Sequence, residues 1–464
     1  MSVRHRLGAL DRLFLAAETR ESMMHVGGLL QFSPPPEGGR DVLRNLRDEM
    51  RAGPIVRPPW NLKLRHPDLL TSPLQAWVVD DRMDLEYHVR RSALPSPGDE
   101  RELGILVSRL HGSSLDFHRP PWEAHIIEGL EGGRIALYVK VHHALVDGYT
   151  GMRLLTRAMS RDPERADTPM FFSTGTEPRE REAREAEAPP AIDSLFRAIR
   201  DQIGTAKDLT RAIGNLARAR RSHDVTLVSP LQAPRSILNQ KITRARRFAT
   251  QQYPVDRLKA VAKAHGCTLN DVVLAICGGA LRRFLLEQDA LPDQSLTAMI
   301  PVNIRPKDDP GGGNAVGAIL ASLATDVEDP LERLRAIVAS TRHAKEQLQG
   351  MSRNAILQYS GLLMAPLLFS SFPGSAGRVR PAFNLVVSNV PGPDHPLYFR
   401  RWRLDAAYPL SIPFNGYALN VTVESYAGTL GLGFIGCRDA VPHLQRLAVY
   451  TGEALDQLSG AVHT

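Results

Sequence analysis

The sequence predicts an α/β protein with two domains, and three observations support this. Segments of helical periodicity and segments of strand-like alternation are mixed in both halves of the chain, which indicates sheets covered by helices. The chain has 464 residues, more than one ordinary domain holds. Between the halves, Glu177–Pro190 alternates Glu and Arg, as solvated linkers do. We therefore expect an N-terminal domain over residues 1–172, a charged linker and basic helix over 173–230, and a C-terminal domain over 231–464.

In the N-terminal half we expect a strand at His25–Phe32 and another at Ile135–Val141. The second alternates apolar residues with Ala, Tyr and Lys, as a strand with one buried face does. A helix is expected to follow at Gly151–Met159.

In the C-terminal half, caps and turns predict the elements. Val255–Ala264 is expected to be a helix that stops near Gly266, and Leu269–Leu286 a helix with Thr268 as its N-cap. The remaining expected elements are strands at Leu296–Asn303 and Phe383–Ser388, a loop at Gly311–Asn314, helices at Pro330–Leu348 and Arg353–Phe369, and a hairpin of Leu419–Tyr426 with Thr429–Ile435.

Two segments have two interpretations each. Ile192–Leu216 carries apolar residues at helical spacing among many arginines, so it is either a surface helix packed on the protein or a helix attached to an anionic membrane surface. Asn354–Gly377 has no charge, but Pro366 and several polar residues make it a poor membrane span. It is either an ordinary core helix or an interfacial helix that touches lipid.

Composition excludes several classes of protein. Three cysteines in 464 residues argue for a reducing compartment and against a disulfide framework, and no catalytic cysteine pattern surrounds them. The N-terminus has charged residues in place of an uninterrupted apolar core, so it is not a secretory signal. A net charge of +7 favours an anionic partner. Nucleic acid is the weakest candidate, because the chain has no nucleic-acid-binding motif and few aromatic residues.

The most specific motif is His142-His143-Ala144-Leu145-Val146-Asp147-Gly148, directly after the alternating strand. A histidine held at the end of a strand is well placed to act as a general base. Successive strand side chains point to opposite faces, so the two rings diverge, and the register of Val139 and Val141 continues to His143. Strand ends distort, however, so register alone does not decide which ring faces a substrate.

Each part of this motif also has an ordinary interpretation. Asp147-Gly148 is a common turn dipeptide, and a histidine at the end of a strand is more often a packing residue than a catalyst. A metal site is a poor explanation, because adjacent strand histidines diverge and the sequence offers no motif that would complete a coordination shell. The whole combination is much more specific than its parts.

The motif resembles the HHxxxDG block of the CoA-dependent acyltransferase superfamily, and other segments resemble blocks of the bacterial wax ester synthase/diacylglycerol acyltransferase family. These blocks occur in family order from about residue 8 to about 440, and Pro121 stands where the family usually has Leu. The matching segments are Met24–Gly28, Arg119–Glu123, Thr268–Ala275 and Ser388–Pro393. The resemblance implies two chloramphenicol-acetyltransferase-like lobes, each a mixed sheet with helices, which meet at a central cleft or tunnel.

The resemblance also implies roles for the motif residues. His143 is expected to be the general base, which takes a proton from the acceptor hydroxyl and returns it to the departing CoA thiolate. Asp147 is expected to pair with Arg305 and so to join the lobes below the site. His142 is expected to orient the loop by hydrogen bonding. Gly148 is expected to let the backbone turn where a side chain would obstruct the tunnel.

Asn270 is a second candidate with two interpretations. It either donates a hydrogen bond to the oxyanion or positions the acceptor, or it satisfies backbone groups at the start of its helix. Asp271 lies in the first helical turn, where the helix dipole favours a carboxylate. Trp122 is expected to lie in the core or in the tunnel wall.

The resemblance implies an acyl-CoA-dependent O-acyltransferase that esterifies diacylglycerol to triacylglycerol, with long-chain alcohols as a second class of acceptor. It implies no cofactor besides acyl-CoA as co-substrate, and no metal. We expect a cytoplasmic enzyme bound peripherally to the inner face of the plasma membrane or to lipid inclusions. The alternatives are a wax ester synthase, condensation-domain-like chemistry on carrier-bound thioesters, and a catalytically weak lipid-binding paralogue.

Overall fold

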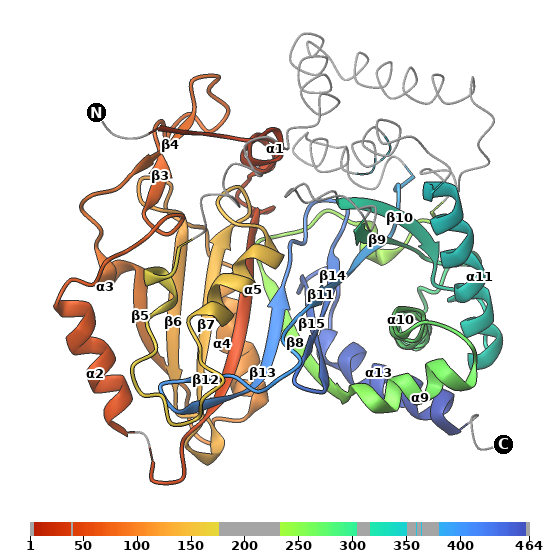
Figure 1. Cartoon of the computed structure of the whole chain (residues 1–464). Coiled ribbons are helices and arrows are strands. Elements are labelled where there is room, and N and C mark those ends of the chain that lie inside the picture. The colour runs from red at the N-terminus through yellow and green to blue at the C-terminus, as the bar shows by residue number, and fades with distance from the viewer. Residues whose placement is uncertain are drawn as a thin grey trace.

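The computed structural model describes residues 4–38, 40–175, 233–303, 316–349, 359, 363 and 380–460. Two lobes lie side by side, each built on a six-stranded sheet (Figure 1). This confirms the expected mixed α/β architecture.

The N-terminal lobe has a large sheet of strand order β12-β13-β2-β7-β6-β5 and a small sheet of order β1-β4-β3. The large sheet is mixed, because β5 runs parallel to β6 and the other pairs are antiparallel. Its strands are β2 (His25–Ser33), β5 (Val89–Ala93), β6 (Trp122–Glu128), β7 (Ile135–His142), β12 (Tyr398–Phe399) and β13 (Trp402–Leu410). The small sheet contains β1 (Arg4–Arg6), β3 (Leu62–Leu64) and β4 (Ala76–Val79), and the helices are α1 (Ala9–Ala17), α2 (Arg40–Arg51), α3 (Leu85–His88), α4 (Glu100–His111) and α5 (Gly148–Arg157).

Helices α4 and α5 cover opposite faces of the large sheet, and two adjacent glycines of β2 show why. A Cβ at Gly27 would lie 3.2 Å from the Tyr138 ring, on the α4 side, and one at Gly28 would lie 3.0 Å from Met152 Sδ of α5. Both helices can therefore approach β2 closely because these positions have no side chain.

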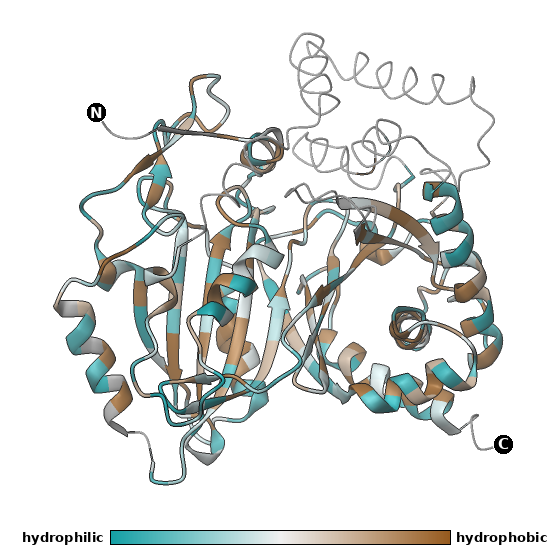
Figure 2. Ribbon diagram, viewed as in Figure 1, coloured by the Kyte–Doolittle hydropathy of each residue, from teal (hydrophilic) through white to brown (hydrophobic). Residues whose placement is uncertain are grey.

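The C-terminal lobe has a sheet of order β10-β9-β11-β14-β15-β8, in which β11 runs parallel to both of its neighbours. Helix α10 is buried around most of its circumference, and Figure 2 shows it apolar on all sides. The strands are β8 (Arg246–Pro254), β9 (Thr297–Asn303), β10 (Val316–Ser322), β11 (Leu385–Pro391), β14 (Leu419–Tyr426) and β15 (Thr429–Cys437). The helices are α9 (Val255–Ala264), α10 (Leu269–Leu286), α11 (Pro330–Gln349) and α13 (Leu444–Gly460).

The C-terminal half of the chain contributes two strands to the N-terminal lobe. Strands β12 and β13 belong by sequence to the C-terminal half, yet β13 pairs antiparallel with β2 and extends the N-terminal sheet. The predicted bounds, which assign all of residues 231–464 to the C-terminal domain, do not include this contribution to the N-terminal sheet. The pairing joins segments that are more than 350 residues apart, so no local pattern announces it.

Many predicted elements are confirmed. Helices α9 and α10 and strand β14 have the expected bounds, and Gly266 has φ +60, as a helix stop requires. The hairpin turn places both Ala427 and Gly428 at positive φ. The predictions for Glu177–Pro190, the basic helix at 192–216, the loop at 311–314 and Arg305 lie outside the described residues. So does most of the predicted helix at 353–369.

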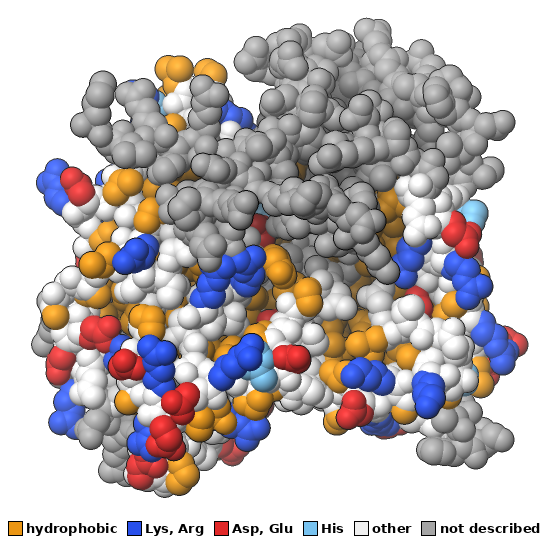
Figure 3. Space-filling model, in the orientation of Figure 1, with side chains coloured by type: hydrophobic (Ala, Val, Ile, Leu, Met, Phe, Trp, Pro, Cys, Tyr) orange, Lys and Arg blue, Asp and Glu red, His pale blue; other side chains and the backbone are white. Residues whose placement is uncertain are grey.

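Of the helices that the structure describes, none is both long and apolar enough to cross a bilayer. On the face drawn in Figure 3, Lys and Arg side chains of the described residues are interspersed with Asp and Glu over both lobes. The positive net charge is therefore not gathered into one patch on this visible part of the surface.

Candidate active site

His142 is the last residue of β7, and its side chain is buried. Its ring meets Phe117 edge-on, and its Nδ1 accepts a hydrogen bond from the backbone N–H of Ala144 at 3.1 Å. In a neutral ring that accepts at Nδ1, the proton must sit on Nε2. His142 Nε2 lies 3.5 Å from Glu18 Oε2. The Ala144 contact agrees with the expectation that His142 orients the loop.

His143 directly follows the strand and is half-buried. Its ring stacks on Phe14 of α1, with 3.9 Å between ring centroids and 25° between planes. Its backbone N–H donates to the carbonyl oxygen of Met24 at 2.8 Å. The two histidines therefore contact different groups, as strand alternation predicts. His143 is the more accessible of the two.

Asp147 is the N-cap of α5. Its carboxylate accepts from the backbone N–H of Thr150 and from the Thr150 hydroxyl, both at 2.8 Å. An N-cap explains why α5 begins at Gly148, earlier than the predicted Gly151. Arg305 lies outside the described residues, so the ion pair with Asp147 stays a prediction.

The reason expected for Gly148 is wrong in one respect. Gly148 is the first helical residue of α5, and its φ is not in the positive region that favours glycine. A Cβ there would meet none of the described atoms within 4 Å, so the backbone turn does not require glycine. That a larger side chain at this position would obstruct a tunnel stays a prediction.

Asn270 lies in the first turn of α10 and is half-buried. The cap itself is formed by its neighbours, because the Thr268 hydroxyl accepts from Asp271 N–H while the Asp271 carboxylate accepts from Thr268 N–H at 2.9 Å. Asp271 also accepts from the Thr341 hydroxyl of α11 at 2.7 Å. The capping role weighed for Asn270 thus belongs to Thr268 and Asp271, and its catalytic role stays a prediction.

A buried ion cluster lies on the α4 side of β7. Lys140 Nζ donates to the carbonyl oxygens of Leu110 and Ser113 and lies 3.3 Å from Glu123 Oε2. Burial favours the neutral carboxyl, but nearby His125 and the charges of Lys140 and Arg90 lower the pKa of Glu123 to about 2. The cluster fixes the end of α4 against β6 and β7. Of these two strands, β7 is the one that ends at the histidine pair.

A second buried group contains neutral histidines. Burial lowers the pKa of His111 to about 3, and burial together with nearby His111 and Lys140 lowers that of His25 well below its usual range. His25 Nε2 donates to the carbonyl oxygen of His111 at 2.9 Å, and His111 Nδ1 pairs with the Tyr138 hydroxyl at 2.8 Å. These contacts hold β2 and α4 together and are structural.

Trp122 is also buried, with its ring stacked on His88, which confirms its expected place in the core.

The sequence did not indicate two neighbours of the histidine pair. Phe14 and Glu18 are four residues apart, Phe14 in the C-terminal half of α1 and Glu18 at its C-cap. The spacing that places them on one side of a helix is visible in the sequence. It does not reveal which strand the helix packs against.

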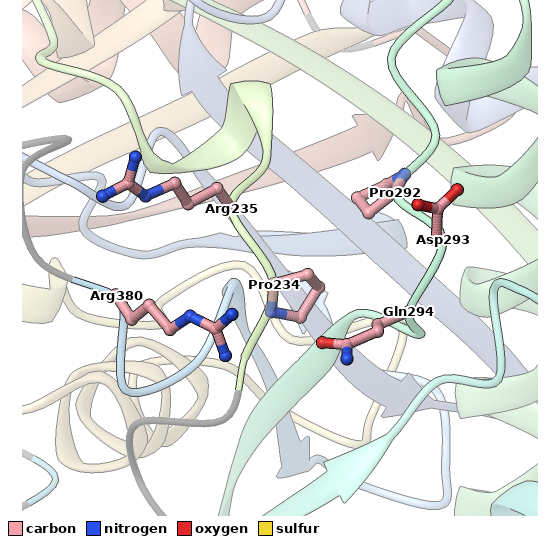
Figure 4. Close-up of a pocket in the computed structure, with 6 residues that line it drawn as sticks. All are labelled: Pro234, Arg235, Pro292, Asp293, Gln294 and Arg380. Atoms are coloured by element: carbon pink, nitrogen blue, oxygen red, sulfur yellow. The ribbon is translucent and has the colours of Figure 1, made fainter.

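A pocket of the C-terminal lobe has a volume of about 600 Å³ (Figure 4). Arg235 and Arg380 lie on one side of it, and Pro292 and Asp293 on the other. Its lining contains none of the predicted site residues. Within the described ranges, no group of three or more His, Cys, Asp or Glu side chains is arranged to hold a metal ion.

Comparison with known proteins connects this site to a family. Residues 7–273 match the wax ester synthase/diacylglycerol acyltransferase catalytic domain, and residues 312–459 match the C-terminal domain of the same family. A putative diacylglycerol O-acyltransferase of Mycobacterium tuberculosis is 53% identical over 98% of this chain and 97% of its own length. The O-acyltransferase WSD of Acinetobacter baylyi is 39% identical over 98% and 97%.

A solved structure agrees with the sequence matches. The wax ester synthase/diacylglycerol acyltransferase of Marinobacter aquaeolei VT8 superposes with a TM-score of 0.81 at 38% identity, and the match covers 99% of this chain and 100% of that one. The resemblance seen in the sequence is therefore confirmed along nearly the whole chain. The protein belongs to the wax ester synthase/diacylglycerol acyltransferase family.

Proposed function

We propose that this protein transfers the acyl group of a long-chain acyl-CoA to the free hydroxyl of diacylglycerol, with His143 as general base. Family membership supports the reaction class, and the name of the 53% identical relative supports diacylglycerol as acceptor. The observation that carries the residue assignment is the setting of His143. Its backbone is tied to Met24 and its ring is stacked on Phe14, yet the residue is only half-buried.

His143 supports a direct transfer without an acyl-enzyme. The imidazole accepts the hydroxyl proton as the alcohol oxygen attacks the thioester carbonyl carbon. The tetrahedral intermediate then expels the CoA thiolate, which takes the proton back from His143, so the products are an ester and free CoA thiol. Stacking on Phe14 fixes the plane of the imidazole and so favours the geometry that this transfer needs.

Wax ester synthesis is the second candidate function. The Marinobacter relative carries both activities in its name, and this chain matches its full length. A fatty alcohol offers the same attacking hydroxyl without the glycerol backbone. Because both acceptors dissolve in lipid, we further propose peripheral attachment to a membrane face or a lipid inclusion.

The test supplies the purified protein with one long-chain acyl-CoA and, separately, with diacylglycerol or a fatty alcohol. Thiol release and lipid product are followed together. Equal amounts of thiol and triacylglycerol support the proposal. Thiol release without ester would show thioester hydrolysis, and ester formation only with fatty alcohol would favour the wax function.

The role of His143 is tested by His143→Ala. We expect turnover to fall about 100-fold or more, because general-base assistance is lost, while the melting temperature changes little for a half-buried ring. Turnover and thermal unfolding are measured on the same preparation. A variant that keeps most of its turnover would remove His143 from the role of base.

A further inference from the structure

We infer that Glu18 is a positioning residue that fixes both histidines of the pair, an inference that rests on the proposed role of His143. Glu18 follows α1 directly and is its C-cap. Its side chain is 9% exposed, and its carboxylate faces the ring of His142. One contact connects this carboxylate to the ring of His142, and two hydrogen bonds in series through Met24 connect it to the backbone of His143.

The first contact is with His142. Glu18 Oε2 lies 3.5 Å from His142 Nε2, which has no hydrogen-bond partner among the described residues. Because Nδ1 accepts from Ala144 N–H, the Nε2 proton faces the carboxylate. A negative charge there stabilises this tautomer over the alternative, which would turn the Nδ1 proton against the Ala144 amide. The carboxylate therefore holds the ring in the orientation that shapes the loop.

The second and third contacts lead to His143. Glu18 Oε2 accepts a hydrogen bond from the backbone N–H of Met24 at 2.5 Å. The carbonyl oxygen of Met24 in turn accepts from the backbone N–H of His143 at 2.8 Å. The carboxylate thus holds Met24, the residue whose carbonyl oxygen binds the backbone of the proposed base. Displacing Met24 would displace His143.

Helix α1 combines these contacts. Phe14 and Glu18 are separated by one helical turn, so the helix presents them to the same side. Phe14 contacts the ring of His143, and Glu18 contacts the ring of His142. One rigid element therefore sets both the ring plane of the base and the tautomer of its neighbour.

The same carboxylate also lies near two buried cations. Its stabilisation of these cations must be separated from its positioning of the histidines. Its charge favours the charged forms of Lys140 and Arg246. Glu123→Gln is the matched control, because it too removes a buried carboxylate beside Lys140. Glu123 forms ion pairs with Lys140 at 3.3 Å and with Arg90 at 3.4 Å, and its Oε2 lies 3.8 Å from His125 Nε2. Ser22→Ala is a second control, because it removes a buried hydrogen bond to Asn415 N–H from the turn that follows Glu18.

The test compares Glu18→Gln with these controls by kcat, KM and pH profile. We expect kcat of Glu18→Gln to fall about 10-fold or more with KM within about twofold of wild type, because a misplaced base affects the transition state more than substrate binding. We also expect the acid limb of kcat/KM to move to lower pH, because loss of a nearby negative charge disfavours imidazolium. Both controls should keep kcat within about twofold and leave the limb unmoved.

A double-mutant cycle with His142→Asn tests whether Glu18 acts on kcat through His142. If Glu18 acts through His142, the double variant should have the kcat of the less active single variant. If instead the fold-losses in kcat of the two single variants multiply in the double variant, the proposal is overturned. An unchanged kcat in Glu18→Gln, or an equal loss in Glu123→Gln, would overturn it as well. His143→Ala distinguishes the two hypotheses. An active His143→Ala would contradict the proposed role of His143 as general base, whereas an inactive His143→Ala beside an active Glu18→Gln would contradict only the positioning role of Glu18.

Discussion

Glu424 shows how one side chain explains both a sequence block and a pH response. It lies on β14 with 1% of its surface exposed, and its Oε2 has no hydrogen-bond partner in the described structure. Burial raises the pKa of its carboxyl to about 8, so the group is largely neutral at pH 7. A Cβ at Gly392 would lie 3.0 Å from Glu424 Oε1 and would overlap the backbone oxygen of Ser425. The glycine in the Ser388–Pro393 block is therefore needed for close packing against β14.

This pKa predicts a loss of stability as pH rises. The folded value lies above that of an unfolded Glu, so the contribution is fully present below about pH 4.5 and is lost as pH rises through about 8, on the order of 5 kcal/mol in all. Glu424→Gln stays neutral, so its melting temperature should fall less than that of wild type between pH 6 and pH 9. Glu287→Gln, at the exposed end of α10, is the control and should follow wild type. Parallel curves for Glu424→Gln and wild type would contradict the assignment.

At the residue scale, the sequence predicts the members of the site better than their partners. The strand pattern before His142 correctly predicts that the two rings face different groups, because alternation is a local property. It gives no sign of Phe14 and Glu18, whose contacts cross more than 100 positions. The expected reason for Gly148 fails because the sequence does not reveal that Asp147 caps a helix there and keeps Gly148 helical.

At the element scale, helices with strong local signals are predicted to the residue. Helix α10 begins where Thr268 and Asp271 form a capping box, and α9 ends before a glycine at positive φ. Strand β13 was not predicted. Its register shifts at a bulge between Leu404 and Ala406, and its partner β2 is distant in sequence.

The cap of α5 gives a prediction at this scale. Asp147→Ala removes the acceptor for Thr150 N–H and should cost about 1 kcal/mol of stability, while Asp147→Asn keeps an acceptor and should cost less. Asp99→Ala is the matched control, because Asp99 caps α4 through Glu102 N–H at 2.9 Å. We expect a loss of stability at least as large from Asp147→Ala as from Asp99→Ala, because the predicted ion pair with Arg305 would be lost together with the cap. We expect a loss of turnover only from Asp147→Ala, because α5 directly follows the histidine loop. Thermal unfolding and turnover check this, and equal turnover in the two alanine variants would show that the α5 cap does not support the site.

At the scale of the whole molecule, the position of β13 in the N-terminal sheet makes the stability of each lobe depend on the other. Strand β13 completes the N-terminal sheet, and its backbone also packs against β15 of the C-terminal lobe, where a Cβ at Gly431 would lie 2.7 Å from the Ala407 oxygen. In the same interface, Phe248 N–H of β8 donates to the Ser108 hydroxyl of α4 at 2.9 Å. A site at the end of β7 is held rigid only while both lobes are folded.

This dependence predicts that damage in one lobe unfolds the other. A Cβ at Gly433 of β15 would overlap the backbone oxygen of Pro409 in β13, which cannot rotate away as a side chain does, so Gly433→Ala should cost about 1–3 kcal/mol. Gly104→Ala is the control at the same interface, because its Cβ would lie 3.4 Å from the Phe248 oxygen, an ordinary contact. All the tryptophans of the chain, Trp60, Trp77, Trp122 and Trp402, lie in the N-terminal lobe, and Trp402 is on β13 itself, so their fluorescence reports on that lobe including β13.

In urea, we expect Gly433→Ala to shift the tryptophan transition and the far-ultraviolet circular dichroism transition to lower concentration together, although the substitution lies in the C-terminal lobe. Gly104→Ala should leave both midpoints near those of wild type. If Gly433→Ala shifts circular dichroism alone and the tryptophan midpoint stays in place, the lobes unfold independently. In that case β13 does not couple them, and the rigidity of the histidine site must come from the N-terminal lobe by itself.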